Sequence, residues 1–229
     1  MVKRLFDIVF SLISLLITFP LFLIMIFWIK IDSKGTVFYR GIRIGKNGKT
    51  FKIFKFRSMV FDADKMGGSS TSAEDRRITA SGRFIRKWKL DELAQLINVL
   101  KGDMSLVGPR PEVKEFVDLY NEKEMKILTI RPGITDWASI WNSNEGGVLE
   151  GAIDADAVYL EVIRPIKLEL QLYYSETYNF YKDLKILFCT VYKVINSSFV
   201  PIEISTHPNF ELLRGRALQV IENQKNKGI

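Results

Sequence analysis

The 229-residue sequence has little of the side chains that most often bind soft metals or form nucleophile–histidine pairs. It contains one cysteine, Cys189, and one histidine, His207. A single cysteine excludes an internal disulfide, and the two side chains together are too few for a structural zinc site. A Ser-His-Asp or Cys-His catalytic system is implausible for the same reason. Any acid–base or nucleophilic chemistry therefore falls to carboxylates, lysines, tyrosines or hydroxyl groups.

Negative charge is scarce in the first quarter of the chain. The net charge is +7 overall, yet residues 1–60 alone carry +9, so the remainder carries −2. With 47% hydrophobic and 26% charged residues, the chain fits neither a disordered protein nor a polytopic membrane protein. The eleven basic residues of this first quarter are Lys3, Arg4, Lys30, Lys34, Arg40, Arg43, Lys46, Lys49, Lys52, Lys55 and Arg57.

Charge is absent altogether from Ile8 to Ile29, a run of 22 residues. An uncharged apolar stretch of about 20 residues is long enough to cross a bilayer as a helix. A secretory signal peptide is rejected, because the run is too long and Lys30-Ile31-Asp32 follows in place of a small-residue cleavage site. The sequence therefore predicts a membrane segment at the N-terminus.

The topology of this segment is open between two arrangements. Pro20 lies near its centre, where proline removes a backbone donor and kinks a helix. Basic residues flank both ends, and the positive-inside rule places basic flanks in the cytoplasm. A re-entrant helix that breaks at Pro20 satisfies both flanks, whereas a spanning helix with a tolerated proline satisfies one. The basic flank also favours anionic membrane lipid as a partner. Nucleic-acid binding is the weaker interpretation of the same charges, because they adjoin a membrane segment.

The rest of the chain is predicted to contain both strands and helices. Val37–Ile44 and Thr50–Phe56 alternate apolar and polar residues around Asn47-Gly48, which predicts a β-hairpin. The Ser- and Gly-rich stretch 62–82 predicts a loop, either a lid or disordered. Apolar residues at 90, 93, 96, 97 and 100 predict a helix that stops at Gly102.

The second half is predicted to be mostly helical. Gly108–Pro111 is expected to be extended, because two prolines restrict it. We expect a helix over Glu112–Ile130, irregular structure over Trp137–Glu150, and helix over Ile153–Asn196 with a break at Pro165. The apolar, Tyr-rich part of that last segment suits either the membrane interface or ordinary core packing. Residues 200–229 read as a polar tail.

One acidic pair, Asp91-Glu92, stands at the start of the predicted 90–100 helix among basic residues. Acidic residues in a first turn often do no more than complement the helix dipole. Here Arg86 precedes them by about one turn, Arg110 follows between two prolines, and Arg131 precedes a third proline. Arginine on a stiff frame loses little freedom on binding an anion, and its fork suits phosphate oxygens.

This combination suggests phosphoryl transfer at a bilayer surface. A carboxylate held among arginines stays ionised and can attack phosphorus. A Mg²⁺ ion bound by Asp91, Glu92 and phosphate oxygens would screen the charge of an incoming diphosphate. The alternative from another class is a non-enzymatic membrane-surface scaffold that binds anionic lipid through its basic residues. That alternative explains residues 1–60 but not the cluster from Arg86 to Arg110.

The stretch Gly82–Pro111 (GRFIRKWKLDELAQLINVLKGDMSLVGPRP) closely resembles the signature of the monotopic phosphoglycosyl transferases, the bacterial sugar transferase family. The resemblance covers nearly all of residues 1–196. Further matching segments are Lys3–Asp7, Arg43–Gly48, Lys55–Met59, Arg131–Thr135, Tyr173-Tyr174 and Asp183–Ile186.

The resemblance implies transfer of a sugar-1-phosphate from a UDP-sugar to undecaprenyl phosphate, with release of UMP, at the start of lipid-linked glycan assembly. Asp91 would be the nucleophile that forms a covalent phosphosugar–enzyme anhydride, and Glu92 its partner. Arg86 and Arg110 would hold phosphates, and Mg²⁺ would be the cofactor. The family's membrane segment is a re-entrant helix–break–helix, which favours re-entry at Pro20, on the cytoplasmic face of the bacterial inner membrane.

The implied fold is α+β and mainly helical. A re-entrant membrane helix (1–35) precedes a compact cytoplasmic-face catalytic domain (36–199), which contains a small β-hairpin and interfacial amphipathic helices. Residues 200–229 form a polar tail. The chain looks like the minimal form of the family, without a multi-helix N-terminal region. Asp136-Trp137 stands where the family commonly has Gly-Trp, a departure that could alter sugar selection. The sugar, the pathway, the uridine-binding residues and a homo-oligomeric state stay open.

Overall fold

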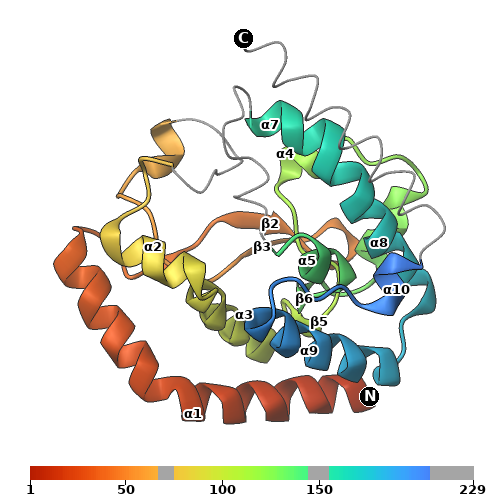
Figure 1. The fold of residues 1–229 in the computed structure, drawn as a ribbon, viewed down its shortest axis with the longest axis horizontal. Helices are drawn as coiled ribbons and strands as arrows, with labels where there is room; N and C mark the ends of the chain where they lie inside the picture. The colour runs from red at the N-terminus through yellow and green to blue at the C-terminus, as the bar shows by residue number, and fades with distance from the viewer. Residues whose placement is uncertain (67–74, 144–154, 207–229) are drawn as a thin grey trace.

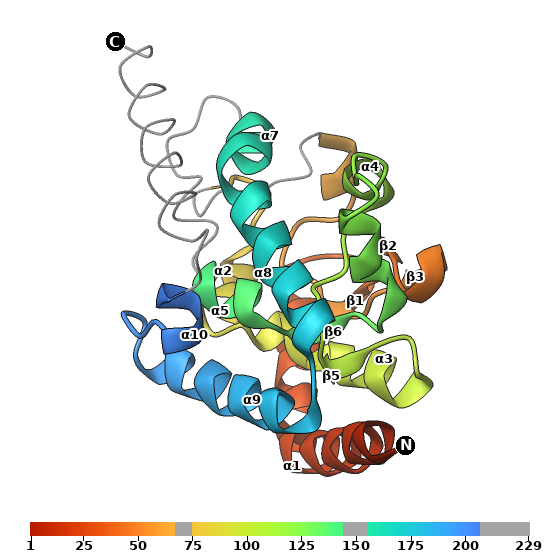
Figure 2. The ribbon, with the colours of Figure 1, turned by 90° about the vertical axis from the view of Figure 1, so that its right-hand side faces the viewer.

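A computed structural model describes residues 1–66, 75–143 and 155–206. The described chain is mainly helical, with three small two-stranded sheets between the helices. A long helix, α1 (Val2–Asp32), runs along one edge of the molecule, and the remaining elements gather on one side of it (Figures 1 and 2). The prediction of a mainly helical α+β fold with an apolar N-terminal helix is confirmed.

Helix α1 contains Pro20 in its interior and is still continuous over 31 residues. Figure 1 shows that its axis changes direction strongly along its length, as expected where proline removes a backbone hydrogen bond. It is the one helix in the described chain that is long and apolar enough to cross a membrane. Most of its apolar side chains are exposed, and its buried face includes Phe22, Met25 and Ile29.

The N-terminal end of α1 is fixed to the rest of the protein by buried polar contacts. The Lys3 ammonium donates to the carbonyl oxygen of Val107 at 2.9 Å. The Asp7 carboxylate is 2% exposed, and it accepts hydrogen bonds from the Ser105 hydroxyl at 2.8 Å and the Leu106 amide at 3.1 Å. These contacts hold the first turns of α1 against the centre of the domain.

The C-terminal end of α1 is fixed to the same domain. The Asp32 carboxylate accepts hydrogen bonds from the Ser81 amide at 2.8 Å and the Ser81 hydroxyl at 2.7 Å. The buried Arg57 guanidinium donates to the carbonyl oxygens of Ser33 and Lys34, each at 2.7 Å, and so fixes the backbone that follows the helix. Both ends of α1 therefore lie against one compact unit.

The predicted hairpin is confirmed. Strand β2 (Ile42–Ile44) pairs antiparallel with β3 (Thr50–Lys52), and β1 (Phe38–Tyr39) pairs with β4 (Lys55–Phe56). The connection includes a 3₁₀ turn at Lys46–Gly48, where Asn47 and Gly48 have φ of 56° and 74°. Asn and Gly tolerate positive φ, which is why this dipeptide predicts the turn.

The predicted helix over residues 90–100 begins with a different geometry. Leu90–Ala94 form a 3₁₀ helix, and α3 (Gln95–Lys101) continues from it. The stop at Gly102 is confirmed, because this residue caps α3 with φ of 90°. Before this unit, α2 (Ala80–Lys87) is capped by the Thr79 hydroxyl, which accepts from the Gly82 amide at 3.0 Å.

The single helix predicted over Glu112–Ile130 is wrong. The chain forms α4 (Lys114–Val117) and a separate 3₁₀ helix at Glu124–Thr129. The physical reason is a reciprocal pair between Asn121 and Glu124, each of whose side chains accepts a hydrogen bond from the other's amide, at 3.0 and 2.9 Å. Such a capping pair begins a new helix, so the first helix cannot continue through it.

Two parallel strands, β5 (Ser105–Val107) and β6 (Gly133–Thr135), form the centre of the domain. The irregular structure predicted from Trp137 onward is wrong for its first residues, because Asp136 caps a short helix, α5 (Trp137–Trp141). Residues 144–154 lie outside the described chain, as do residues 67–74 of the predicted loop and 207–229 of the predicted tail.

The helical prediction for the C-terminal half is confirmed, but the break lies elsewhere. Pro165 occupies the first turn of α8 (Arg164–Thr177), where a missing amide costs nothing. The break comes at Tyr178, and the Asn179 side chain then caps α9 (Phe180–Ile195) by accepting from the Lys182 amide at 2.9 Å. Ahead of α8 lie α7 (Ala155–Val158) and a π-helical turn at Tyr159–Ile163.

The core lies between β5, β6, α5, α8 and α9. Its largest fully buried side chains include Trp137, Tyr174 and Ile166. Beyond residue 199 the chain forms α10 (Ile202–Ser205), and Ile204 is fully buried in this core. The first part of the expected tail therefore packs on the domain.

Candidate active site

The acidic pair lies in the 3₁₀ turn that leads into α3. Lys89, just before this turn, has a left-handed backbone with φ of 54°, which ends α2 and redirects the chain. Asp91 is buried at 8% exposure, and Glu92 is partly buried beside it. The two carboxylates therefore face the interior of the domain rather than bulk solvent.

Glu92 is held by two cations from distant parts of the chain. The Arg110 guanidinium contacts both carboxylate oxygens, Nη1 to Oε2 at 3.1 Å and Nη2 closely to Oε1. The Lys55 ammonium donates to Oε1 at 3.3 Å. Burial alone would raise the pKa of Glu92, but the charges of Arg110 and Lys55 outweigh it, and the pKa lies well below its ordinary value. Glu92 is therefore ionised across the physiological pH range.

Lys55 also reaches the other carboxylate, with Nζ 3.5 Å from Oδ2 of Asp91. The three-residue contact among Lys55, Asp91 and Glu92 joins strand β4 to the 3₁₀ turn. Lys55 was not predicted as a site residue, although the segment Lys55–Met59 matches the family motif. Lys55 and Asp91 are 36 residues apart in the sequence, and no local sequence pattern predicts their contact.

Arg110 is positioned by a tightly folded loop after β5. A Cβ at Gly133 would lie 2.0 Å from the Gly108 amide nitrogen, and a Cβ at Gly108 would lie 2.4 Å from the Arg131 carbonyl oxygen. Both glycines are therefore required for the two segments to approach. This loop turns the Arg110 side chain toward Glu92.

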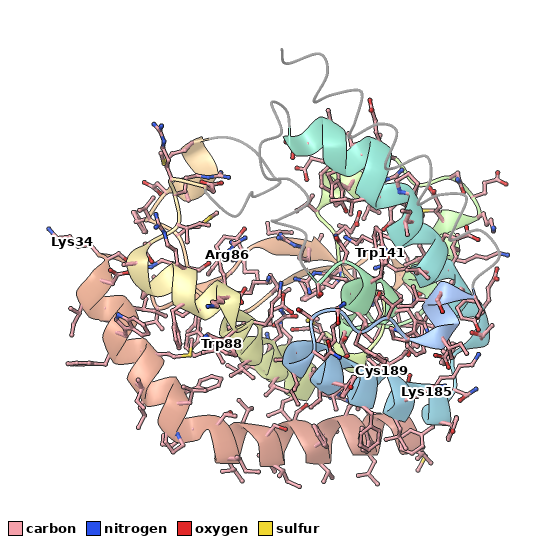
Figure 3. All side chains as sticks on the ribbon, in the orientation of Figure 1. Lys34, Arg86, Trp88, Trp141, Lys185 and Cys189 are labelled. Atoms are coloured by element: carbon pink, nitrogen blue, oxygen red, sulfur yellow. The ribbon has the colours of Figure 1, made fainter. Side chains whose placement is uncertain are left out.

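Arg86 lies in the last turn of α2, on the side opposite to Phe84 and Trp88. Those two rings lie together, and Phe84 also packs on Trp28 of α1, so Arg86 faces away from α1 (Figure 3). Hydrogen bonds from Arg77, and more weakly the charge of Arg86, hold the pKa of Asp75 below its usual range despite burial. Arg86 is thus on the inner side of α2, in the region of Asp75.

Arg131 is not brought to the acidic pair. It is exposed, and its Nε donates to the Gly102 carbonyl oxygen at 3.1 Å. Gly102 caps the far end of α3, about 18 Å along the helical unit from Asp91. The structure therefore joins Asp91, Glu92, Arg110 and Lys55, and leaves Arg131 at the opposite end of this unit.

The acidic pair is the place where a divalent cation could bind with a substrate phosphate. No group of three or more His, Cys, Asp or Glu side chains in the described ranges could hold a metal by itself. Mg²⁺ commonly takes one or two carboxylates and completes its shell with phosphate oxygens and water. Each carboxylate oxygen has a second lone pair, so Glu92 keeps acceptor capacity beside Arg110. The donor set fits such a substrate-assisted ion.

Chemically, the site offers two carboxylates in different states. Asp91 is buried and has no bidentate partner among the described residues, whereas Glu92 forms a bidentate ion pair with Arg110. Asp91 can attack an electrophile, while Glu92, Arg110 and Lys55 form a charged frame around it. The cations also suit the oxygens of a bound phosphate or diphosphate.

A comparison with known proteins matches the bacterial sugar transferase family to residues 1–197. The chain is 38% identical over 213 residues to an uncharacterized sugar transferase of Bacillus subtilis, EpsL, with 93% of this chain and 96% of that protein covered. It is 36% identical over 197 residues to UDP-N-acetylgalactosamine-undecaprenyl-phosphate N-acetylgalactosaminephosphotransferase of Aeromonas hydrophila, with 85% of this chain and 44% of that protein covered.

A third relative is UDP-glucose:undecaprenyl-phosphate glucose-1-phosphate transferase of Escherichia coli. The identity is 38% over 199 residues, with 84% of this chain and 40% of that protein covered. The chain therefore spans less than half the length of these two relatives with named activities, and nearly the whole length of EpsL.

Proposed function

The chain belongs to the bacterial sugar transferase family, and from that premise we propose that it transfers a sugar-1-phosphate from a UDP-sugar to undecaprenyl phosphate. UMP is the second product of this reaction. The lipid-linked product would begin the assembly of a bacterial polysaccharide or other glycan. The single observation that carries the proposal is the buried Asp91 beside the ion pair of Glu92 with Arg110.

The proposed chemistry has two steps on one phosphorus atom. In the first, an Asp91 carboxylate oxygen bonds to the phosphorus that carries the sugar, and the bond from that phosphorus to the UMP oxygen breaks. In the second, an oxygen of undecaprenyl phosphate bonds to the same phosphorus, and the bond to Asp91 breaks. Asp91 is regenerated as a carboxylate, so the cycle needs no other reactant.

The other residues have supporting roles in this proposal. Arg110 and Lys55 attract the diphosphate, and their contacts with Glu92 fix where their charges lie before the substrate arrives. Arg86, on the inner side of α2, would bind a phosphate oxygen. The phosphate-binding role of Arg131 stays a prediction, and its side chain lies outside the cluster of Lys55, Asp91, Glu92 and Arg110.

Mg²⁺ is proposed as the cofactor, held by Asp91, Glu92 and the oxygens of the diphosphate. When bound, it would neutralise charge on the diphosphate and on the departing UMP. Asp91 and Glu92 contribute the protein's oxygens, and Arg110 keeps the Glu92 carboxylate in one orientation.

We also propose that α1 enters the membrane and returns to the same face. A straight helix of 31 residues would separate its ends by about 45 Å, more than the roughly 30 Å hydrocarbon core of a bilayer. Both ends of α1 instead hydrogen-bond to one domain, through Asp7 at the start and Asp32 at the end. That domain would lie on the cytoplasmic face of the inner membrane.

The exposed apolar side of α9 supports this placement. Phe188, Val191 and Ile195 are 75%, 62% and 78% exposed. In both views α9 lies beside the N-terminal part of α1 (Figures 1 and 2). Phe6 of α1 packs edge-to-face on Phe180 of α9. The two helices thus offer an apolar surface for the membrane interface. Cysteines at Val2 and Lys34 in a Cys189→Ser background should both be labelled from the cytoplasmic side, and labelling of either from the other side contradicts re-entry.

The non-enzymatic scaffold is not favoured, because it gives the buried site around Asp91 no role and because the relatives with named activities are transferases. A direct test is to incubate the protein in detergent or nanodiscs with undecaprenyl phosphate, Mg²⁺ and a panel of UDP-sugars. UMP release with at least one donor supports the proposed function and identifies the sugar. Failure of a folded, membrane-bound preparation to release UMP from any donor contradicts it.

A further inference from the structure

Asp136 is a fully buried carboxylate at the junction of β6 and α5, with 0% exposure. It stands where the bacterial sugar transferase family commonly has glycine, a departure that could alter sugar selection. Its burial argues against direct contact with a sugar. A buried carboxylate is costly unless hydrogen bonds compensate it, so its partners indicate what it does.

The two oxygens of Asp136 have different partners. Oδ1 accepts a hydrogen bond from the Ser139 amide at 2.7 Å, which caps α5. Oδ2 accepts from the Arg110 amide at 3.2 Å and from Nε2 of Gln171 at 3.1 Å. The carboxylate therefore joins a helix cap to the backbone of a residue in the active site.

The contact with the Arg110 backbone is the more informative one. Pro109 and Pro111 have no amide hydrogen, so the Arg110 N–H is the one backbone donor of this tripeptide. Asp136 accepts it. Gln171, which is fully buried on α8, also approaches the Arg110 carbonyl oxygen at 3.4 Å. Both polar backbone groups of Arg110 are thus hydrogen-bonded, to Asp136 and Gln171, while its guanidinium contacts Glu92.

We propose that Asp136 is a positioning residue: with Gln171 it fixes the backbone of Arg110, and through Arg110 it sets the affinity of the site for the diphosphate of the donor. The inference rests on the proposed function and deepens it. Asp136 would affect binding of the diphosphate, which all UDP-sugars share. Its loss should therefore weaken all donors by the same factor, whatever the sugar.

The matched variants are Asp136→Ala and Asn179→Ala. Each removes the side chain that caps a helix, α5 or α9, but Asn179 caps by its contact with Lys182, away from Arg110. Asp136→Ala should raise the KM for the UDP-sugar about tenfold, the equivalent of 1.4 kcal/mol, with a much smaller change in kcat. Asn179→Ala should lower the thermal midpoint without moving KM.

The measurement is UMP release against donor concentration for two or more UDP-sugars. An equal rise in KM for every donor with Asp136→Ala supports the inference. A wild-type KM, or a change in the preference between sugars, overturns it. If Asp136→Ala does not fold, Gln171→Met removes the neighbouring contact and should raise KM in the same direction; an unchanged KM there also overturns the inference. Absence of UMP release in the wild-type protein would instead contradict the proposed function.

Discussion

Lys3 in the first turn of α1 and Asp183 in the first turn of α9 form an ion pair, with Nζ 2.5 Å from Oδ2, although 180 residues separate them. Asp183 is almost completely buried, and its other oxygen accepts from the Tyr174 hydroxyl at 2.6 Å. Burial and the neighbouring Asp183 charge raise the pKa of Tyr174, so this hydroxyl stays protonated and remains a donor. The pair joins the beginning of α1 to the core.

Lys3→Met should lower the free energy of unfolding by about 1–3 kcal/mol, because Asp183 would keep its buried charge and lose its cation. The midpoint of urea unfolding in detergent is the measurement. Lys34→Met is the control, since the Lys34 side chain is exposed near the other end of α1, and it should change the midpoint little. Equal midpoints for Lys3→Met and the wild type would contradict a stabilising role for the pair.

A second buried cluster predicts a larger effect. The Glu112 carboxylate lies 2.6 Å from Nζ of Lys167 and accepts from the Tyr159 hydroxyl at 2.6 Å. Lys167→Met should cost about 3–5 kcal/mol, because an unpaired buried carboxylate remains. Lys114→Met breaks an exposed pair with Asp118 and should cost under about 0.5 kcal/mol.

Urea unfolding of the double variant Lys167→Met/Glu112→Gln provides the check on this cause. It should recover much of the stability lost in Lys167→Met, since it removes the uncompensated charge. If the double variant is as unstable as Lys167→Met, the loss of stability comes from lost packing and not from an uncompensated charge.

The ion pair of Glu92 with Arg110 predicts a pH dependence of stability. Since Arg110 and Lys55 lower the pKa of Glu92 in the folded protein below its ordinary value of 4.5, the pair stabilises the fold above about pH 4.5. This contribution declines as pH falls below that value toward the folded-state pKa. The stability difference between wild type and Glu92→Gln should therefore be constant from about pH 5 to 7 and shrink in more acidic solution. A difference that grows on acidification would contradict the assignment.

Lys55→Met should lower kcat/KM for UMP release by roughly 10- to 100-fold, because the cation that contacts both carboxylates of the site is lost. Lys52→Met is matched to it. Lys52 is an exposed lysine on β3, the strand that precedes β4 in the sequence, and its loss should leave kcat/KM within about twofold of wild type. Wild-type kinetics in Lys55→Met would remove this residue from the site.

Local patterns predicted much of the fold. The hairpin follows from Asn47-Gly48 and the end of α3 from Gly102, because each depends on the backbone freedom of one or two residues. The apolar run predicts α1 because it depends on composition alone. The single helix over Glu112–Ile130 failed because the pair of Asn121 with Glu124 starts a second helix inside one apolar pattern.

The candidate site could be predicted only in part. Asp91, Glu92 and Arg110 lie within one sequence motif, and the structure places the Arg110 guanidinium against Glu92. The contacts of Lys55 with Asp91 and of Asp136 with Arg110 join different elements, and they depend on how β4, α5 and α8 pack. Arg131 shares its residue type and its proline neighbour with Arg110, yet it donates to Gly102. Residue type and spacing do not distinguish these two arginines; tertiary packing does.

The most direct test of the central claim is the intact mass of the protein after mixing with its donor in the absence of undecaprenyl phosphate. We expect a mass increase of one phosphosugar on the wild type, located at Asp91, which disappears when undecaprenyl phosphate is added. Asp91→Asn should fold, stay membrane-bound and gain no mass. A wild-type enzyme that turns over donor and lipid without ever gaining this mass, or an Asp91→Asn variant that still gains it, would contradict the account.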